Sequence, residues 1–499
     1  MNQTTVEPAA TPGEPGTSPP AHARLWPPGW WPVLSIAAVV AAVHVAISPF
    51  GGYWIDEVYM LAVGRYHPDW GYADQPPVAP LLARAMDWIA PDWLPLLRLP
   101  AALASAATVV LTALIARELG ADRRAQVIAA AAAATGLWAA FVGHWVTPYT
   151  LEPPLWLLMS WLLVRWVRLH GEGRADDRLL LALGGAAGVA AQTKFQVFAF
   201  AAALLCSVLV FGPRSLLRRP MLWAGVGIAL LVAFPTLLWQ AAHDWPQLRM
   251  AGAVVSESPM LSGGRIGTAR NMVLFAGVAG AFLLCFGVWR LLTAAELRAY
   301  RFFGVSVVLL YVLFLATAAR PYYLVSIYGV ALAAGAVGLQ RRRERGRTRL
   351  RWVAWPAFAL SAAGACAIAM VSAFSAQAWA QFGLAGDLTK ETAAAYQSLP
   401  AEMRSRTAIL GKTYIQAAIL DVSGTHAGLP NTYSLHRGYG YFDPPGEETE
   451  HVLYVGSDLG GLPRYFARVE QVGSGEQPVW LLTGKQERWE VIWPRLRHL

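Results

Sequence analysis

The stretch YYLVSIYGVALAAGAVGLQRRRERGRTRLR, residues 322–351, joins an apolar run to a cluster of seven arginines. A membrane-spanning helix needs roughly 20 apolar residues, and arginine-rich loops stay on the cytoplasmic side. The rest of the chain continues this pattern, since 56% of its 499 residues are hydrophobic and only 14% are charged. Soluble domains carry about 25% charged residues. The composition therefore excludes a soluble, disordered or disulfide-scaffold protein and predicts a polytopic membrane protein.

Apolar runs of sufficient length predict about 11 membrane spans. They lie near residues 32–50, 97–116, 125–142, 153–169, 179–193, 195–212, 221–240, 271–290, 302–319, 322–340 and 352–374. A cytoplasmic N-terminus places half of the 40 basic residues in inside loops and leaves Lys194 and Arg320 almost alone outside. The net charge of +9 therefore reflects membrane topology, and nucleic-acid binding is not expected.

The chain is expected to have three parts. Residues 1–24 are rich in Pro, Thr, Gly and Ala and predict a disordered cytoplasmic tail, and residues 25–374 form the transmembrane domain with an outer loop at 51–96. Residues 375–499 alternate strand-like and helix-like patterns, which predicts a small extracytoplasmic α/β domain. In a bacterium this protein would lie in the inner (plasma) membrane, with the C-terminal domain periplasmic or extracellular. Glycines in apolar runs such as LGGAAGVAA predict close helix packing.

Scarce ionisable residues are predicted at the outer ends of the spans, where burying charge is costly and usually functional. They are Asp56, Glu57, Glu152, Lys194, His243 and Arg320. Acids, cations and a histidine on one face are the groups needed to bind a phosphate and to deprotonate a hydroxyl. The three cysteines lie inside apolar runs, so neither a disulfide nor a cysteine metal site is expected.

Asp56 and Glu57 follow the first span and allow two interpretations. They either offset the positive end of a helix or supply a general base that activates an acceptor. Tyr59 lies three residues on and shares the helix face of Asp56. Glu152 allows the same choice between a helix-start acid and a functional acid.

The basic candidates also have structural alternatives. Lys194 is either a snorkelling lysine or, in a tight outer turn, a phosphate contact. Arg320 lies on the predicted outer side although basic residues concentrate in cytoplasmic loops, and this favours a function. Its neighbours Tyr322 and Tyr323 also suit membrane anchors. His243 suits an interfacial histidine as well as a catalytic one.

The stretch WGYADQPPVAPLLARAMDWIA, residues 70–90, predicts a capped, proline-initiated amphipathic helix on the outer leaflet. Such a helix could border the access route of a lipid-linked substrate. The sequence has no P-loop, dinucleotide-binding glycine motif or paired-histidine metal motif.

A series of motifs resembles bacterial glycosyltransferase family 39, which is akin to protein O-mannosyltransferases and lipid A aminoarabinose transferases. The motifs are WIDEVYMLAVGRYHPDWGYADQPPVAPLLARAMDWI (54–89), TPYTLEPPLWLL (147–158), AAQTKFQ (190–196), PTLLWQAAHDWP (235–246), ARPYYLVSIYGVALAAGA (319–336) and GKTYIQAAILDVSGTHAGLPNTYSLHRGYGYFDPP (411–445). The resemblance implies a GT-C fold enzyme that uses a polyprenyl-phosphate sugar.

By the same resemblance, Asp56 is the catalytic base with Glu57 beside it, and Glu152 is a second acid. Lys194, Arg320 and Tyr322 or Tyr323 match residues near the donor phosphate. Gln75 belongs to the expected donor-phosphate residues, but it stands where relatives carry a Lys or His, so the phosphate contact there differs from the family pattern. In the outer domain Thr413 and Gln416 replace Asn and Glu, and residues 434–436 replace Asn-Tyr-Trp. These departures bear on acceptor identity more than on reaction type.

The leading hypothesis is therefore an inverting membrane glycosyltransferase acting on an extracytoplasmic glycolipid such as lipid A, a polysaccharide or a protein. Because the donor carries one phosphate and the protein offers basic groups, no cofactor is required, although a divalent metal is compatible with the sequence. A transporter or flippase of a lipid-linked or amphiphilic solute and a structural subunit are the alternatives. A transporter should place ionisable groups near the middle of the membrane, whereas these groups are predicted at one outer face.

Overall fold

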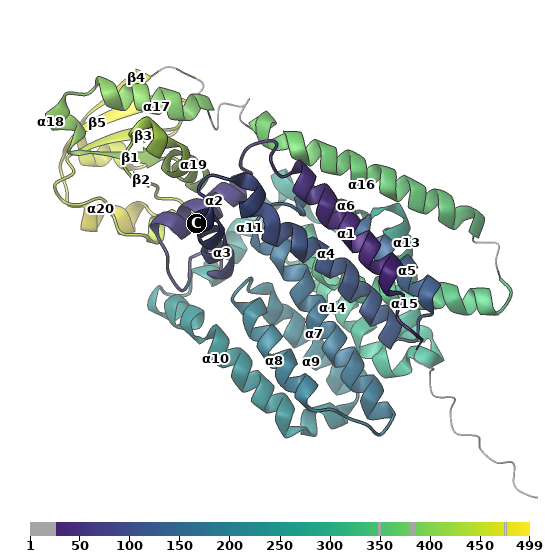
Figure 1. The fold of residues 1–499 in the computed structure, drawn as a ribbon. Coiled ribbons are helices and arrows are strands. Elements are labelled where there is room, and N and C mark those ends of the chain that lie inside the picture. Colours follow the sequence, from purple (N-terminus) through teal and green to yellow (C-terminus); the bar gives the residue numbers. More distant parts are fainter. Residues whose placement is uncertain (1–25, 348–350, 380–385, 474, 476) are drawn as a thin grey trace, which may run out of the picture.

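The computed structural model describes the chain except residues 1–25, 348–350, 380–385, 474 and 476. The predicted disordered tail lies outside the described residues. The described chain forms a large bundle of helices with a small, sheet-containing domain at one end (Figure 1). This arrangement confirms the predicted fold class, an α-helical membrane protein with a C-terminal α/β domain.

The bundle contains long helices joined by short turns. Its helices are α1 (Trp30–Ile47), α2 (Ile55–Tyr66), α3 (Val78–Ile89), α4 (Leu94–Glu118), α5 (Arg123–Ala134), α6 (Leu137–Val142), α7 (Pro148–Gly171), α8 (Arg178–Ala191), α9 (Gln196–Phe211), α10 (Pro220–Ala242), α11 (Pro246–Ser262), α12 (Gly264–Leu274), α13 (Gly277–Thr293), α14 (Arg301–Ala316), α15 (Tyr328–Glu344) and α16 (Arg351–Trp379), with 3-10 helices η1 (Arg214–Arg218), η2 (Ala295–Tyr300) and η3 (Pro321–Ile327). Proline begins α7, α10 and α11, because its fixed φ and missing N–H suit the first helical position.

Six of the described helical segments are long and apolar enough to cross a membrane. They are Trp30–Ile47, Leu94–Glu118, Pro220–Ala242, Ala295–Ala316, Pro321–Glu344 and Trp352–Phe374. The pair α12 and α13, bent by 94°, gives a seventh if it forms one broken span. The apolar helices α8 and α9 have only 14 and 16 residues, and the predicted run 125–142 is divided between α5 and α6. The count of about 11 spans therefore stays a prediction.

Glycine permits the close packing of α8 against α10, as the LGGAAGVAA stretch predicts. A Cβ added to Gly184 would meet the backbone of Gly225, and one added to Gly225 would meet the backbone of Leu180. Gly185, the next residue, faces open space. The small residue is therefore required on one face of α8 only.

The C-terminal domain is built around one mixed sheet. Its elements are α17 (Gly386–Ser398), α18 (Ala401–Arg404), β1 (Thr407–Gly411), α19 (Tyr414–Gly424), η5 (Thr425–Ala427), β2 (Thr432–Tyr433), η6 (Arg437–Tyr441), β3 (His451–Val455), η7 (Leu462–Tyr465), β4 (Phe466–Gly473), β5 (Val479–Lys485) and α20 (Trp489–Leu496). The strand order is β2-β1-β3-β5-β4, with β2, β1 and β3 parallel and β5 antiparallel to both of its neighbours.

Strand β1 is buried on both faces, and its alternating side chains serve two cores. Leu410 packs in a cluster with Trp489 of α20, whereas Ile409 points to the other face and packs with α19. That second cluster continues into α2 of the bundle, through Val58 and its neighbours. Because α19 lies between the sheet and α2, the C-terminal domain is held against the helix that carries Asp56.

Candidate active site

A cavity of about 750 Å³ lies where the bundle meets the C-terminal domain. Its walls come from the start of α2, the turn between α8 and α9, helix α11, the segment before and within η3, and the C-terminal domain. The polar and charged side chains among its lining residues are Asp56, Tyr59, Asp74, Gln75, Tyr149, Lys194, Gln196, Gln247, Ser256, Thr317, Arg320, Tyr322, Tyr323, Tyr414 and Arg437. Segments far apart in the sequence thus contribute to one site.

Asp56 lies in the first turn of α2, and two tyrosines hold its carboxylate. Tyr149 Oη donates to Oδ2 over 3.1 Å, and Tyr414 Oη donates to Oδ1 over 3.3 Å. Burial raises the pKa of Asp56, whereas the nearby Arg437 guanidinium and the two hydroxyl donors lower it. The result is a fixed carboxylate at the cavity wall with a pKa above its ordinary value.

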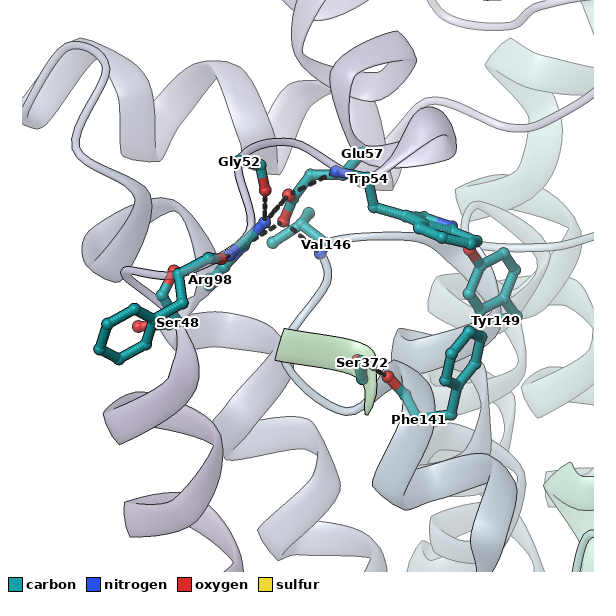
Figure 2. A network of polar contacts seen from close by, with 10 residues as sticks. Ser48, Gly52, Trp54, Glu57, Arg98, Phe141, Val146, Tyr149 and Ser372 are labelled. Carbon is teal, nitrogen blue, oxygen red and sulfur yellow. Dashed lines mark hydrogen bonds and ion pairs between the residues drawn. The ribbon is translucent and has the colours of Figure 1, made fainter. Parts of the chain in front are cut away.

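Glu57 does not line the cavity, although it neighbours Asp56. Figure 2 shows its carboxylate facing Arg98 of α4, with an Nη2–Oε2 distance of 2.7 Å and both side chains fully buried. Arg98 also donates to the carbonyls of Ser48, at 2.6 Å, and Gly52, at 2.5 Å. The pair therefore joins the loop before α2 to α4, and we assign Glu57 to positioning rather than to contact with substrate.

Lys194 lies in the turn between α8 and α9 and points into the cavity. Its ammonium is 3.5 Å from Glu152 Oε2 and lies over the rings of Tyr322, at 4.7 Å, and Tyr323, at 4.2 Å. Among the described residues it has no hydrogen-bond partner, although its nitrogen is buried. Glu152 lies behind the cavity wall, where it also accepts a hydrogen bond from Ser326. A buried cation with unused donors is suited to bind an anion.

Arg320 and Arg437 face each other across one carboxylate. Glu257 of α11 forms ion pairs with both, using Oε2 for Arg320 and Oε1 for Arg437. Arg437 also donates to Tyr414 Oη over 3.3 Å, so it reaches Asp56 through one hydroxyl. The C-terminal domain thus contributes a cation to a site that is otherwise built by the bundle.

The remaining predicted residues divide between the cavity and the structure around it. Tyr59 lines the cavity and donates to Asp74 Oδ1 over 3.0 Å, and burial raises the pKa of Asp74 to about 6. Gln75 also lines the cavity, and its amide nitrogen is buried without a partner among the described residues. His243 does not line it; its ring stacks on Trp239 at 3.9 Å.

Sequence reasoning did not select five charged or hydroxyl residues of this site. They are Asp74, Tyr149, Glu257, Tyr414 and Arg437. Asp74, Tyr149, Tyr414 and Arg437 all lie inside the motifs that carry the family resemblance, and that position is the signal by which they can be found. Glu257 lies on a segment that no motif covers. The described residues contain no group of three His, Cys, Asp or Glu side chains that could hold a metal ion.

The chain is similar in sequence to one known family and in fold to several solved structures. Residues 74–239 match the family described as dolichyl-phosphate-mannose-protein mannosyltransferase, and no curated protein matches the chain. ArnT from Cupriavidus metallidurans, in the apo state, is 15% identical with a TM-score of 0.63, covering 90% of this chain and 97% of ArnT. The same protein bound to undecaprenyl phosphate gives 16% identity, a TM-score of 0.60 and the same coverage.

The oligosaccharyltransferase of Archaeoglobus fulgidus, in complex with Zn and sulfate, is a more distant match. It is 12% identical with a TM-score of 0.53, covering 84% of this chain and 67% of that protein. These comparisons confirm the predicted resemblance and the ArnT-like GT-C membrane fold, and they support a membrane glycosyltransferase.

Proposed function

We propose that this protein is an inverting glycosyltransferase that moves a sugar from a polyprenyl-phosphate donor to an extracytoplasmic acceptor. The acceptor class is a glycolipid such as lipid A, a polysaccharide or a protein. The observation that carries the proposal is one cavity in which the Asp56 carboxylate lies near the buried cations Lys194 and Arg320. A base and phosphate-binding cations are the groups that this transfer requires.

Asp56 is the general base in this mechanism. It accepts the proton of the acceptor hydroxyl while the hydroxyl oxygen forms a bond to the anomeric carbon of the sugar. The bond between that carbon and the phosphate oxygen breaks, and its electron pair leaves with the polyprenyl phosphate. The hydrogen bonds from Tyr149 and Tyr414 support this assignment because they fix both carboxylate oxygens before substrate binds.

Lys194 and Arg320 stabilise the charge that develops on the leaving phosphate. Fixed cations are most effective in a site that excludes water. The Lys194 side chain is 11% exposed and the Arg320 side chain 10%, so both are largely shielded. The same cations would bind the donor phosphate before the reaction. The rings of Tyr322 and Tyr323 lie against the Lys194 ammonium and hold it in place. This scheme assigns no step to a metal ion.

The polyprenyl chain would lie along the apolar side of the cavity. Val254 and Val255 of α11 and Leu313 and Phe314 of α14 form part of that wall. Helix α3 has an exposed apolar face that includes Trp88, which is 83% exposed. Indole rings concentrate at the membrane–water boundary, so we place α3 at the outer leaflet.

The orientation of the chain in the membrane is part of the proposal. The arginine-rich ends of α15 and of the other inside loops would lie in the cytoplasm, and the C-terminal domain would lie outside. This orientation puts the cavity at the outer face of a bacterial inner membrane. Membrane lipid is then the medium from which the donor enters.

The test is donor turnover by the purified full-length protein. It would be incubated with polyprenyl-phosphate sugars and with envelope lipids, glycans or proteins, and free polyprenyl phosphate would be measured together with glycosylated product. Equal release of both supports the proposal. Movement of the donor across liposomes without release of polyprenyl phosphate would instead favour the transporter alternative.

A further inference from the structure

The carboxylate of Glu257 occupies the place between two arginines where an anionic substrate would bind. Its two carboxylate oxygens are divided between Arg320 of the bundle and Arg437 of the C-terminal domain. A carboxylate and the phosphodiester of a polyprenyl-phosphate sugar each present two oxygens that share one negative charge, so both fit the same pair of arginines. We infer that Arg320 and Arg437 together form a subsite for the donor phosphate, and that Glu257 is an internal competitor which the phosphate displaces.

The position of the two arginines supports this assignment. Both line the cavity, and their side chains are only 10% and 15% exposed. Arg437 adopts a left-handed backbone conformation, with φ of 52°, which is uncommon for a residue with a side chain. The backbone N–H of Arg437 donates to the His498 carbonyl over 2.8 Å, which fixes this turn toward the cavity. The subsite is therefore present before any ligand arrives.

The position of Glu257 supports its displacement. It lies on α11, and its side chain is 26% exposed, so the carboxylate can leave the arginines toward solvent. Leu248 and Met260 of the same helix are 73% and 80% exposed, so much of α11 is not held by packing. The helix therefore has room to shift when its ion pairs to the arginines are replaced.

Competition has a measurable consequence for binding. When a ligand binds a form that only a fraction of the molecules adopt, its apparent Kd equals the intrinsic Kd divided by that fraction. If Glu257 occupies the arginines in about nine molecules of ten, removing its charge lowers the apparent Kd for the phosphate about tenfold. The inference rests on the proposed function for the identity of the anion, and it extends that function to a residue on α11 and a residue of the C-terminal domain.

The experiment measures binding of undecaprenyl phosphate to the full-length protein in nanodiscs. Glu257→Gln should lower the Kd about tenfold. Glu257→Asp keeps the charge but shortens the side chain, so it should also tighten binding, whereas a purely long-range charge effect would leave its Kd unchanged. Arg437→Gln should raise the Kd. Glu296→Gln, which removes an ion pair with Arg290 between two residues that do not line the cavity, is the matched control and should leave the Kd as in the wild type.

Hydrogen exchange gives an independent readout. Undecaprenyl phosphate should increase amide exchange in residues 246–262 of the wild type, whereas Glu257→Gln should show the faster exchange without ligand. If the wild type binds and Glu257→Gln binds equally or more weakly, the competition is refuted and the proposed function stands. If neither protein binds undecaprenyl phosphate, the donor class of the proposed function is refuted, and this inference with it.

Discussion

The buried pair of Glu57 and Arg98 offers the sharpest test of how the site is held. Arg98→Met leaves the Glu57 carboxylate without its charged partner in a place with no solvent access. The substitution also removes the hydrogen-bond donors to the carbonyls of Ser48 and Gly52. Removing one member of a buried pair typically costs about 3–5 kcal/mol. We expect that loss in the free energy of unfolding, measured by denaturant titration of the purified protein.

The double variant Arg98→Met/Glu57→Gln should recover part of the loss, because no charge is then buried alone. A coupling energy of about 2 kcal/mol is expected from the two single variants and the double variant. Arg406→Met is the matched control: its pair with Glu450 is exposed, at 49% and 44% for the two side chains, so its loss should be at most about 1 kcal/mol.

The Arg98→Met variant should also lower turnover, because the loop held by Arg98 leads directly into Asp56. A displacement of about 1 Å at a reacting group can cost roughly 100-fold in rate. Turnover would be measured below the temperature at which the variant unfolds, so that the two effects are separated. An Arg98→Met protein with near wild-type stability and turnover would refute the positioning role of the pair.

Three further predictions follow from single contacts. Tyr414→Phe removes a hydrogen bond that lowers the pKa of Asp56, so the acid limb of the pH–rate profile should move to higher pH; an unmoved limb would argue against Asp56 as the base. Gly184→Ala should lower the unfolding temperature by several degrees, whereas Gly185→Ala should not, and equal effects would contradict the close packing of α8. Trp88→Ser should reduce quenching of tryptophan fluorescence by brominated lipids, and unchanged quenching would place α3 away from the membrane.

The sequence predicts those site residues whose charge is rare among the residues around them in the chain. Lys194 and Arg320 are conspicuous because cations are scarce in the outer loops, and Asp56 because an acid follows an apolar run. All three line the same cavity. Charge patterning works here because the membrane makes an isolated charge costly and therefore rare.

The division of roles between neighbours depends on contacts that the sequence does not reveal. The carboxylate of Glu57 binds Arg98, which lies 41 residues further along the chain, whereas the carboxylate of Asp56 lines the cavity. Arg437 and Tyr414 belong to a separate domain, and only the packing of α19 on α2 brings them to Asp56. His243 has suitable chemistry, yet its ring stacks on Trp239, because it is the residue directly after α10 and lies four residues beyond Trp239.

Single-turnover cleavage of a polyprenyl-phosphate sugar by Asp56→Asn tests most directly whether Asp56 is the general base. Asparagine keeps the size of the side chain and one acceptor oxygen for a tyrosine, but its amide cannot take up the proton of the acceptor hydroxyl. Asp458→Asn, an exposed position of the C-terminal domain, is the control. Asp56→Asn is expected to react at least about 100-fold more slowly than the wild type, with donor binding retained. A rate close to that of the wild type in a folded Asp56→Asn protein would contradict the role of Asp56 as the base.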